Sequence, residues 1–305
     1  MPHYSTVLAE IQQEIQPHLQ EGRVADYIPE LARVPLGRFG MALLDADGGL
    51  HTCGEADAPF SIQSISKLFT LALVFRRAEG NLWHRVGREP SGSAFNSLLH
   101  LEYEDGKPRN PFINAGALVV TDAMLSLCED PLESLVGTLQ RLSGNPTVGV
   151  NEAVALSERE CGFRNASLAN FLKSFGRLDH PVEDVLDLYY QHCALEMNVA
   201  DLARAGSFLM NQGVPLGGEE AFIEPNRAKY LNSLMLTCGT YDSVGEFAYR
   251  VGLPAKSGVG GGILAVMPGK FSVAVWSPGL DDSGNSLVGT LALELLTTRT
   301  GLSVF

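Results

Sequence analysis

Ser64 and Lys67, three residues apart in the segment PFSIQSISKLFT (59–70), are the residues whose types and spacing best fit catalysis. Positions i and i+3 share one face of a helix, so a neutral lysine amine could take the proton of the serine hydroxyl and make it a nucleophile. The apolar neighbours of Lys67 would desolvate its amine and lower its pKa toward that of a base. The alternative is that Ser64 caps a helix and Lys67 is an exposed charge. Ser66 is excluded as the partner of Lys67, because adjacent residues do not share a helix face.

A second segment, AKSGVGGG (255–262), carries a Lys-Ser-Gly element at the start of a predicted strand. Its small residues would let a substrate approach the backbone, where an N–H group could donate a hydrogen bond to an oxyanion. Such an element is the usual companion of S-x-x-K in enzymes that form an acyl-serine. The alternative is a tight turn into an edge strand. The segment is not a phosphate-binding loop, because its lysine precedes the glycines.

Histidine and cysteine residues do not form a competing site. The seven histidines stand in no Ser-His-Asp context and the sequence has no G-x-S-x-G motif, so Lys67 is the expected base. The five cysteines form no C-x-x-C pair and no Cys/His spacing typical of zinc. We therefore expect reduced structural thiols and no bound metal.

Polar residues recur between the predicted helices, in the runs NPFINAGA (110–117), SERE (157–160) and RN (164–165). Each run taken alone is typical of a helix cap or a turn. Taken together, they could supply the amides and the carboxylate that bind a zwitterionic small molecule.

The elements that must position these residues follow an α+β pattern. Apolar runs separated by turn residues predict paired strands over 38–56 and a hairpin over 260–279, and a final helix covers 286–299. Helical periodicity dominates from about 112 to 236. We expect one antiparallel sheet built from N- and C-terminal strands, with flanking helices and an inserted helical lobe. The chain is expected to be a single domain over 1–305, with a sheet lobe of about 1–60 and 240–305 and a helical lobe of about 61–239.

Charge and hydropathy narrow the classes of partner. A net charge of −13 and a pI near 5.0 argue against binding to nucleic acid or to an anionic membrane surface. The sequence has no apolar run of about 18 residues that could span a membrane. It also has no basic and apolar N-terminal leader, so we expect a cytoplasmic protein.

With these motifs in place, the chain resembles the serine-dependent glutaminases of bacteria, which have the β-lactamase and penicillin-binding-protein type of fold. The resemblance covers nearly the whole chain in ordered blocks: YIPELA (27–32), QSISK (63–67), NPFINAGA (110–117), SE to RN (157–165), YYQ (189–191), CGTYD (238–242) and PAKSGV (254–259). It implies hydrolysis of L-glutamine to L-glutamate and ammonia without a cofactor. It also implies a homo-oligomer, either a dimer or a tetramer.

The resemblance also implies catalytic roles for individual residues. Ser64 would attack the side-chain carboxamide after Lys67 has taken its proton. The backbone N–H groups of Ser64 and Val259 would hold the oxyanion. Tyr241 would sit beside Lys67 and pass protons, including the one that lets ammonia leave.

Substrate contacts are implied by the same correspondence. Asn114, Glu158, Asn165 and Tyr189 would surround the α-amino and α-carboxylate groups, with Tyr27 near the mouth of the pocket. Glu158 suits an ammonium, and the amide and hydroxyl donors would bind the carboxylate without a buried cation. The role of Lys256 stays open: it contacts the substrate carboxylate, as its counterpart does in related folds, or it is structural.

Two other functions are compatible with the same fold. One is a penicillin-interacting serine acyl-enzyme of the β-lactamase type, but a serine-aspartate-asparagine element is missing and Tyr241 takes its place. The other is a non-catalytic amino-acid sensor, but sensors usually lose the nucleophile or the base, and Ser64 and Lys67 are both present.

Overall fold

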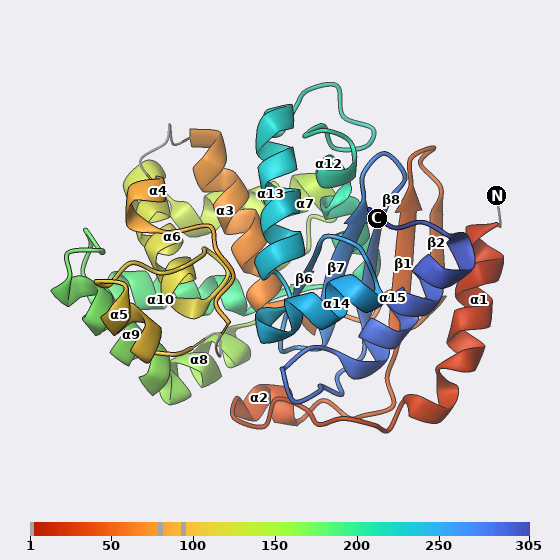
Figure 1. Ribbon diagram of the computed structural model, residues 1–305, viewed down its shortest axis with the longest axis horizontal. Coiled ribbons are helices and arrows are strands. Elements are labelled where there is room, and N and C mark those ends of the chain that lie inside the picture. Colours follow the sequence, from red (N-terminus) through yellow and green to blue (C-terminus); the bar gives the residue numbers. More distant parts are fainter. Residues whose placement is uncertain (1–2, 78–81, 93–95) are drawn as a thin grey trace.

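The computed structural model describes residues 3–77, 82–92 and 96–305 and contains a five-stranded antiparallel sheet (Figure 1). The strand order is β2-β1-β8-β7-β6. These strands are β1 (Gly40–Asp45), β2 (Leu50–Gly54), β6 (Ala255–Ser257), β7 (Gly262–Met267) and β8 (Phe271–Trp276). Gly40 of β1 lies opposite Trp276 of β8, so strands from the two ends of the chain are neighbours. The predicted antiparallel sheet built from both ends is confirmed.

The central strands are buried on both faces, which explains why their sequences are unbroken apolar runs rather than alternating patterns. Met41 and Leu43 of β1 pack on one face, where α1 (Tyr4–Glu14) and α15 (Leu287–Thr300) cover the sheet (Figure 1). Ala42 and Leu44 face the opposite way and join the core of the helical part. The sheet is therefore the middle layer between two groups of helices.

The helical part is built around α3 (Ser66–Arg77) and α6 (Asn114–Leu127), which contact each other and are buried over most of their length. α10 (Val182–Cys193) packs against α6 and also contacts α3. The remaining helices are α2 (Pro29–Ala32), α4 (Leu82–Arg85), α5 (Leu99–Tyr103), α7 (Pro131–Ser143), α8 (Glu152–Cys161), α9 (Phe163–Ser174), α11 (Val199–Ala205), α12 (Ser207–Met210), α13 (Pro225–Cys238) and α14 (Val244–Arg250). Short 3₁₀ helices cover Gln16–His18, Gln63–Ile65 and Tyr241–Ser243.

A small second sheet anchors the segment that leads to Ser64. It consists of β3 (Phe60–Ser61), β5 (Leu195–Met197) and β4 (Gly149–Val150), in the order β3-β5-β4. Beyond β3, the backbone N–H of Ile62 donates to the carbonyl of Leu195 at 2.8 Å. The sequence analysis does not predict this sheet, because strands of two or three residues are too short to show a hydrophobic period.

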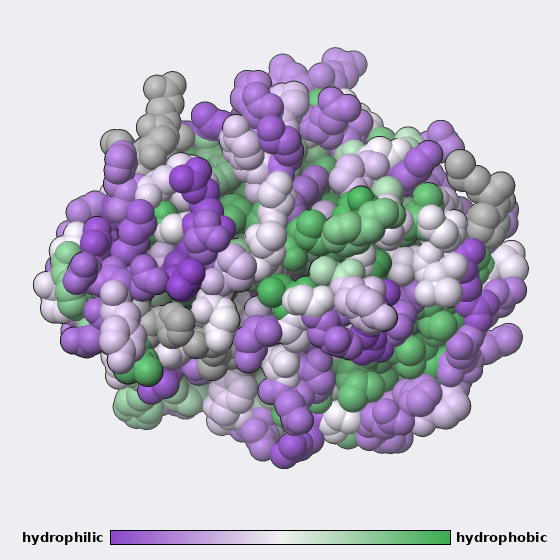
Figure 2. All heavy atoms as spheres, in the orientation of Figure 1, coloured by the Kyte–Doolittle hydropathy of each residue, from purple (hydrophilic) through white to green (hydrophobic). Residues whose placement is uncertain are grey.

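The surface is mainly hydrophilic on the face shown in Figure 2. Hydrophobic side chains gather on this face around the C-terminus, where Val304 and Phe305 are exposed. Within the described residues, no helix has the length and apolarity needed to cross a bilayer.

Candidate active site

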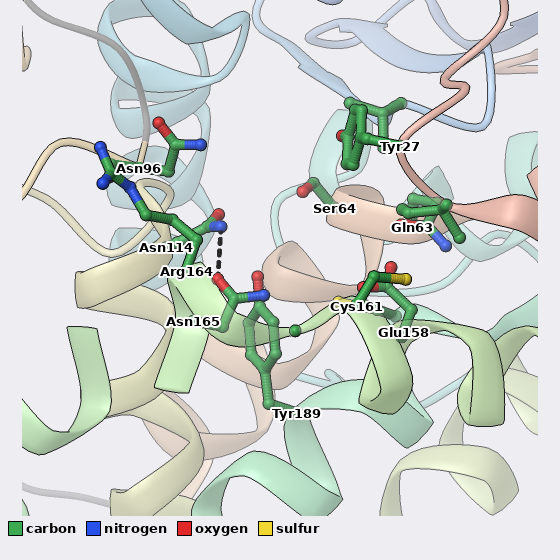
Figure 3. A pocket seen from close by; sticks show the side chains of 14 residues that line it. Tyr27, Gln63, Ser64, Asn96, Asn114, Glu158, Cys161, Arg164, Asn165 and Tyr189 are labelled. Atoms are coloured by element: carbon green, nitrogen blue, oxygen red, sulfur yellow. Dashed lines mark hydrogen bonds between the residues drawn. The ribbon is translucent and has the colours of Figure 1, made fainter. Parts of the chain in front are cut away.

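Ser64 lies in the 3₁₀ turn Gln63–Ile65, directly before α3, and lines a pocket (Figure 3). The turn holds Gln63 at a φ of +49°, which is unusual for a residue with a side chain. Such strained residues cluster at sites where one side chain must be aimed at a ligand. Ser64 therefore precedes the α-helix rather than opening it, and the turn continues into the helix that carries Lys67.

Lys67 is only 1% exposed, so the interpretation of this residue as an exposed charge is wrong. Its Nζ donates to Oδ1 of Asn114 at 2.7 Å and to the carbonyl of Phe112 at 3.4 Å, and it lies 5.7 Å from the ring centroid of Tyr189. Burial lowers the pKa of Lys67 to about 8, against the opposing effects of Cys193 and Glu158. A substantial fraction of this amine is therefore neutral near pH 8, as a general base requires.

Ser66 is turned away from the pocket. It is fully buried, and its Oγ donates to the carbonyl of Gln63 at 2.7 Å and pairs with Nδ1 of His192 at 2.7 Å. Burial lowers the pKa of His192 to about 3, so this histidine is neutral. Neither Ser66 nor His192 lines the pocket, and their contact is a buried structural hydrogen bond.

The loop after β6 passes so close to Ser64 that only glycine fits at position 258. A Cβ at Gly258 would overlap the carbonyl oxygen of Ile62 and would lie 3.3 Å from the backbone nitrogen of Ser64. The next residue, Val259, lines the same pocket. Two backbone segments that can donate N–H groups thus meet beside the Ser64 hydroxyl.

Tyr241 lies behind the pocket, in the 3₁₀ turn Tyr241–Ser243, with a φ of +56°. Burial raises its pKa, while hydrogen bonds with the side chains of Ser64 and Ser257 oppose that rise. The phenol is therefore protonated at neutral pH and adjacent to the serine hydroxyl. Such a group can donate a proton to an atom held at Ser64.

Lys256 is fully buried but does not line the pocket. Its Nζ donates to the carbonyls of Gly239 at 3.0 Å and Ser257 at 2.6 Å, and lies 4.8 Å from the centroid of the Tyr241 ring. Burial lowers its pKa well below the usual value, with a further contribution from the charge of Lys67. These contacts favour the structural role that the sequence analysis left open.

The polar residues predicted to bind substrate surround Ser64. Seven of the predicted site residues line one pocket: Tyr27, Ser64, Asn114, Glu158, Asn165, Tyr189 and Val259. Figure 3 shows Asn114 and Asn165 on one side of Ser64, joined by a hydrogen bond of 2.8 Å from Nδ2 to Oδ1, and Glu158 on the other. Lys67 and Tyr241, the other two, are buried behind this lining, where Lys67 donates to Asn114 and Tyr241 forms a hydrogen bond with Ser64.

Glu158 carries an unusual carboxyl group. Burial raises its pKa to about 7, against a hydrogen bond with Gln63 and the charge of Lys67.

Tyr27 is 56% exposed, which fits a residue at the mouth of the pocket. In the described part of the chain, no group of three or more His, Cys, Asp or Glu side chains could hold a metal ion.

Comparison with known proteins identifies the family. The profile of the family described as Glutaminase matches residues 22–305. The chain belongs to the glutaminase family. It is 56% identical over 302 residues to a glutaminase of Sinorhizobium fredii, covering 98% of this chain and 96% of that protein. It is 57% identical to a glutaminase of Ralstonia nicotianae, with 99% of each chain covered.

Solved glutaminase structures have the same fold. A Bacillus glutaminase superposes with a TM-score of 0.90 at 33% identity, covering 99% of this chain and all of that one. The Bacillus subtilis glutaminase YbgJ, solved as a covalent complex with 5-oxo-L-norleucine, gives a TM-score of 0.89 at 32% identity and the same coverage. The predicted β-lactamase-like fold is confirmed, because bacterial glutaminases share it. The chain is accordingly a glutaminase enzyme, which hydrolyses glutamine. This assignment favours glutamine hydrolysis over the β-lactamase and sensor alternatives.

Other residues of the glutaminase pocket were not predicted as site residues. Asn96, Cys161, Arg164 and Cys193 also line it. Each of the two cysteines is isolated from other cysteines in the sequence, and Asn96 belongs to no motif. The sequence around these three residues therefore does not mark them as part of a site. Arg164 stood in the polar run at 164–165, where only its neighbour Asn165 was assigned a role.

Proposed function

We propose that this glutaminase hydrolyses L-glutamine through an acyl-enzyme formed on Ser64, with Lys67 as the general base. The observation that carries the proposal is the complete burial of Lys67 among neutral hydrogen-bond acceptors, one turn from Ser64, with its pKa lowered to about 8. The covalent complex of the Bacillus subtilis relative with 5-oxo-L-norleucine, whose ketone corresponds in position to the carboxamide carbon of glutamine, supports a covalent mechanism.

In the first half of the reaction, Ser64 Oγ attacks the carboxamide carbon and Lys67 Nζ takes its proton. The tetrahedral intermediate carries a negative oxygen that the N–H groups of Ser64 and Val259 stabilise. The carbon–nitrogen bond then breaks. Tyr241 gives the leaving nitrogen its proton and recovers one from Lys67, so that ammonia departs and glutamyl-Ser64 remains.

In the second half, water replaces ammonia. Lys67 takes a proton from the water, hydroxide attacks the ester carbon in the same oxyanion site, and Ser64 leaves with a proton returned through Tyr241 or Lys67. The balance is glutamine plus water giving glutamate plus ammonia. Neither half needs a metal or an organic cofactor.

We also propose that the two sides of the pocket bind the two charged ends of the substrate. Glu158 binds the α-ammonium, which would stabilise the ionised form of this buried carboxyl. Asn114, Asn165 and Tyr189 bind the α-carboxylate through amide and hydroxyl donors. Tyr27 closes the mouth over the bound amino acid.

A comparison of glutamine with asparagine tests the substrate. We expect kcat/KM for ammonia release to be at least about tenfold lower with asparagine than with glutamine. The side chain of asparagine is shorter by one methylene, so its carboxamide does not reach Ser64 when the α-ammonium and α-carboxylate groups are bound. Equal turnover of the two amides would contradict a pocket built for glutamine. Stable acylation of Ser64 by a labelled penicillin, seen by mass spectrometry, would favour the β-lactamase alternative.

The pH dependence tests the two perturbed groups together. Glu158 must be ionised and Lys67 neutral, so both must lose a proton for activity, and kcat/KM should rise with pH. We expect the logarithm of kcat/KM to rise with a slope approaching two below about pH 7, then one up to about pH 8, before it levels off.

The Glu158→Gln variant is the control for this profile. It should lose the transition near pH 7 and keep the one near pH 8, at a lower overall kcat/KM. A flat wild-type profile between pH 6 and 8 would contradict both roles.

We further propose that the chain is one cytoplasmic domain that assembles into a homodimer or a homotetramer. The five cysteines are free thiols, which supports a reducing compartment. Pairing of β1 with β8 supports a single folding unit. Exposed apolar side chains, among them Phe163 and Phe305, support burial in an assembly, which light scattering can test.

A further inference from the structure

The charged residues that line the catalytic pocket, within the described part of the chain, are Glu158 and Arg164. Figure 3 shows them on opposite sides of Ser64, with Arg164 on the side of Asn114 and Asn165. A zwitterionic amino acid bound over Ser64 would therefore find a negative group on one side and a positive group on the other. The guanidinium lies at the exposed rim of the pocket rather than in its buried floor.

Arg164 is held in place, and no described residue forms an ion pair with it. Its Nε donates to the backbone carbonyl of Asn96 at 3.0 Å, a contact that holds the guanidinium beside Asn96, on the far side of Asn114 from Ser64 (Figure 3). Among the ion pairs of the described residues, none involves Arg164, whereas the nearby Arg159 pairs with Asp187. In a chain of net charge −13, an arginine that lines a pocket and pairs with no carboxylate of the described residues gives this part of the surface a positive charge.

Two helices begin on the same side of the pocket as Arg164. α9 starts after Gly162, which lines the pocket, and its first turn contains no acidic residue and no side-chain cap. α6 starts at Asn114, and it too lacks an acidic first turn and a side-chain cap. The N-terminal ends of helices carry partial positive charge and free N–H groups that favour an anion. This side of the pocket therefore combines the guanidinium of Arg164, which belongs to the first turn of α9, with the first turn of α6; the N-terminus of α9 adds less, because α8 ends at the same Gly162.

We propose that Arg164 recognises the α-carboxylate of the substrate and so restricts the enzyme to free amino acids. The inference rests on the proposed binding of glutamine over Ser64. The family resemblance implies only amide and hydroxyl donors for the carboxylate. Arg164 adds a charge that draws the anion toward these donors and makes α-amides and internal glutamine residues of peptides poorer substrates.

The test compares L-glutamine with L-glutaminamide, in which the α-carboxylate is replaced by a neutral amide. In Arg164→Gln, KM for glutamine is expected to rise about fivefold with kcat nearly unchanged, which is the size of a solvent-accessible ion pair. KM for glutaminamide should stay within twofold of the wild-type value. Arg164→Lys should retain part of the preference for glutamine over glutaminamide. Added NaCl should lower kcat/KM for glutamine less in Arg164→Gln than in the wild-type enzyme.

Arg159→Gln is the matched control, because Arg159 is a nearby arginine that pairs with Asp187 and does not line the pocket. It should show wild-type kinetics with both substrates. An unchanged ratio of kcat/KM between the two substrates in Arg164→Gln would overturn the proposal, as would an equal loss on both. Failure of the proposed function looks different: wild-type enzyme would then release no ammonia from glutamine, or Ser64→Ala would release it normally.

Discussion

Replacement of Ser64 by alanine is expected to lower kcat for ammonia release from glutamine by at least about 10⁴-fold. The substitution removes only the hydroxyl that forms the acyl-enzyme in the proposed mechanism. Lys67→Met, which keeps the volume of the side chain but removes the amine, should cause a loss of similar size because the hydroxyl then has no acceptor for its proton. Initial rates of ammonia release, measured at an enzyme concentration high enough to detect the residual activity, give both losses. The intact mass of each variant after exposure to glutamine shows whether an acyl-enzyme forms.

The double variant distinguishes a catalytic pair from two separate contributions. The effects on kcat of replacing two groups that act in the same step are strongly non-additive. The kcat of the double variant Ser64→Ala, Lys67→Met should therefore lie within about tenfold of the kcat of either single variant. Ser66→Ala is the control, since it removes a neighbouring serine that bonds with His192 outside the pocket. It should lower the free energy of unfolding by about 1 kcal/mol and keep most of the activity. Wild-type turnover in Ser64→Ala, with normal thermal unfolding, would contradict the mechanism.

The sheet could be predicted because its signals are local. The runs around β1, β7 and β8 are apolar throughout, and turn residues separate β1 from β2 at 45–49 and β7 from β8 at 268–270. The 3₁₀ turn that displays Ser64 could not be predicted in the same way. Gln63 has no intrinsic preference for a φ of +49°, and the backbone next to it is held by a hydrogen bond of Ile62 with Leu195, which is distant in the sequence.

For the site, the sequence identified residue types and motifs but not their environment. The spacing of Ser64 and Lys67 was compatible with a cap and an exposed charge until the fold surrounded Lys67 with α6 and Tyr189. Desolvation, and with it the lowered pKa, depends on packing between helices and has no local signature. Arg164 illustrates the converse, because whether an arginine pairs with a carboxylate of the described residues depends on the fold and has no local signal in the sequence.

Gly258→Ala is expected to lower kcat by about 10²- to 10³-fold, the size of a lost oxyanion donor. The added methyl group would overlap the carbonyl oxygen of Ile62. This is a backbone atom, so it cannot move aside as easily as the end of a flexible side chain. The loop after β6 must then shift away from Ser64 and carry the N–H of Val259 out of the oxyanion site. Because the nucleophile and base are untouched, the pH dependence of the residual activity should keep its shape, which separates this loss from one caused by Lys67.

Gly245→Ala is the matched control for the same substitution. Gly245 lies in the exposed first turn of α14 with an ordinary φ, and a Cβ there meets no atom within 4 Å. This variant should keep full activity and gain up to about 1 kcal/mol in the free energy of unfolding, since alanine favours a helix. If Gly258→Ala retained kcat within threefold of the wild-type value, the oxyanion could not depend on the close approach of the two backbones. The contact between Gly258 and the Ser64 backbone would then serve packing alone, and the donor opposite Ser64 would have to be sought elsewhere in the pocket.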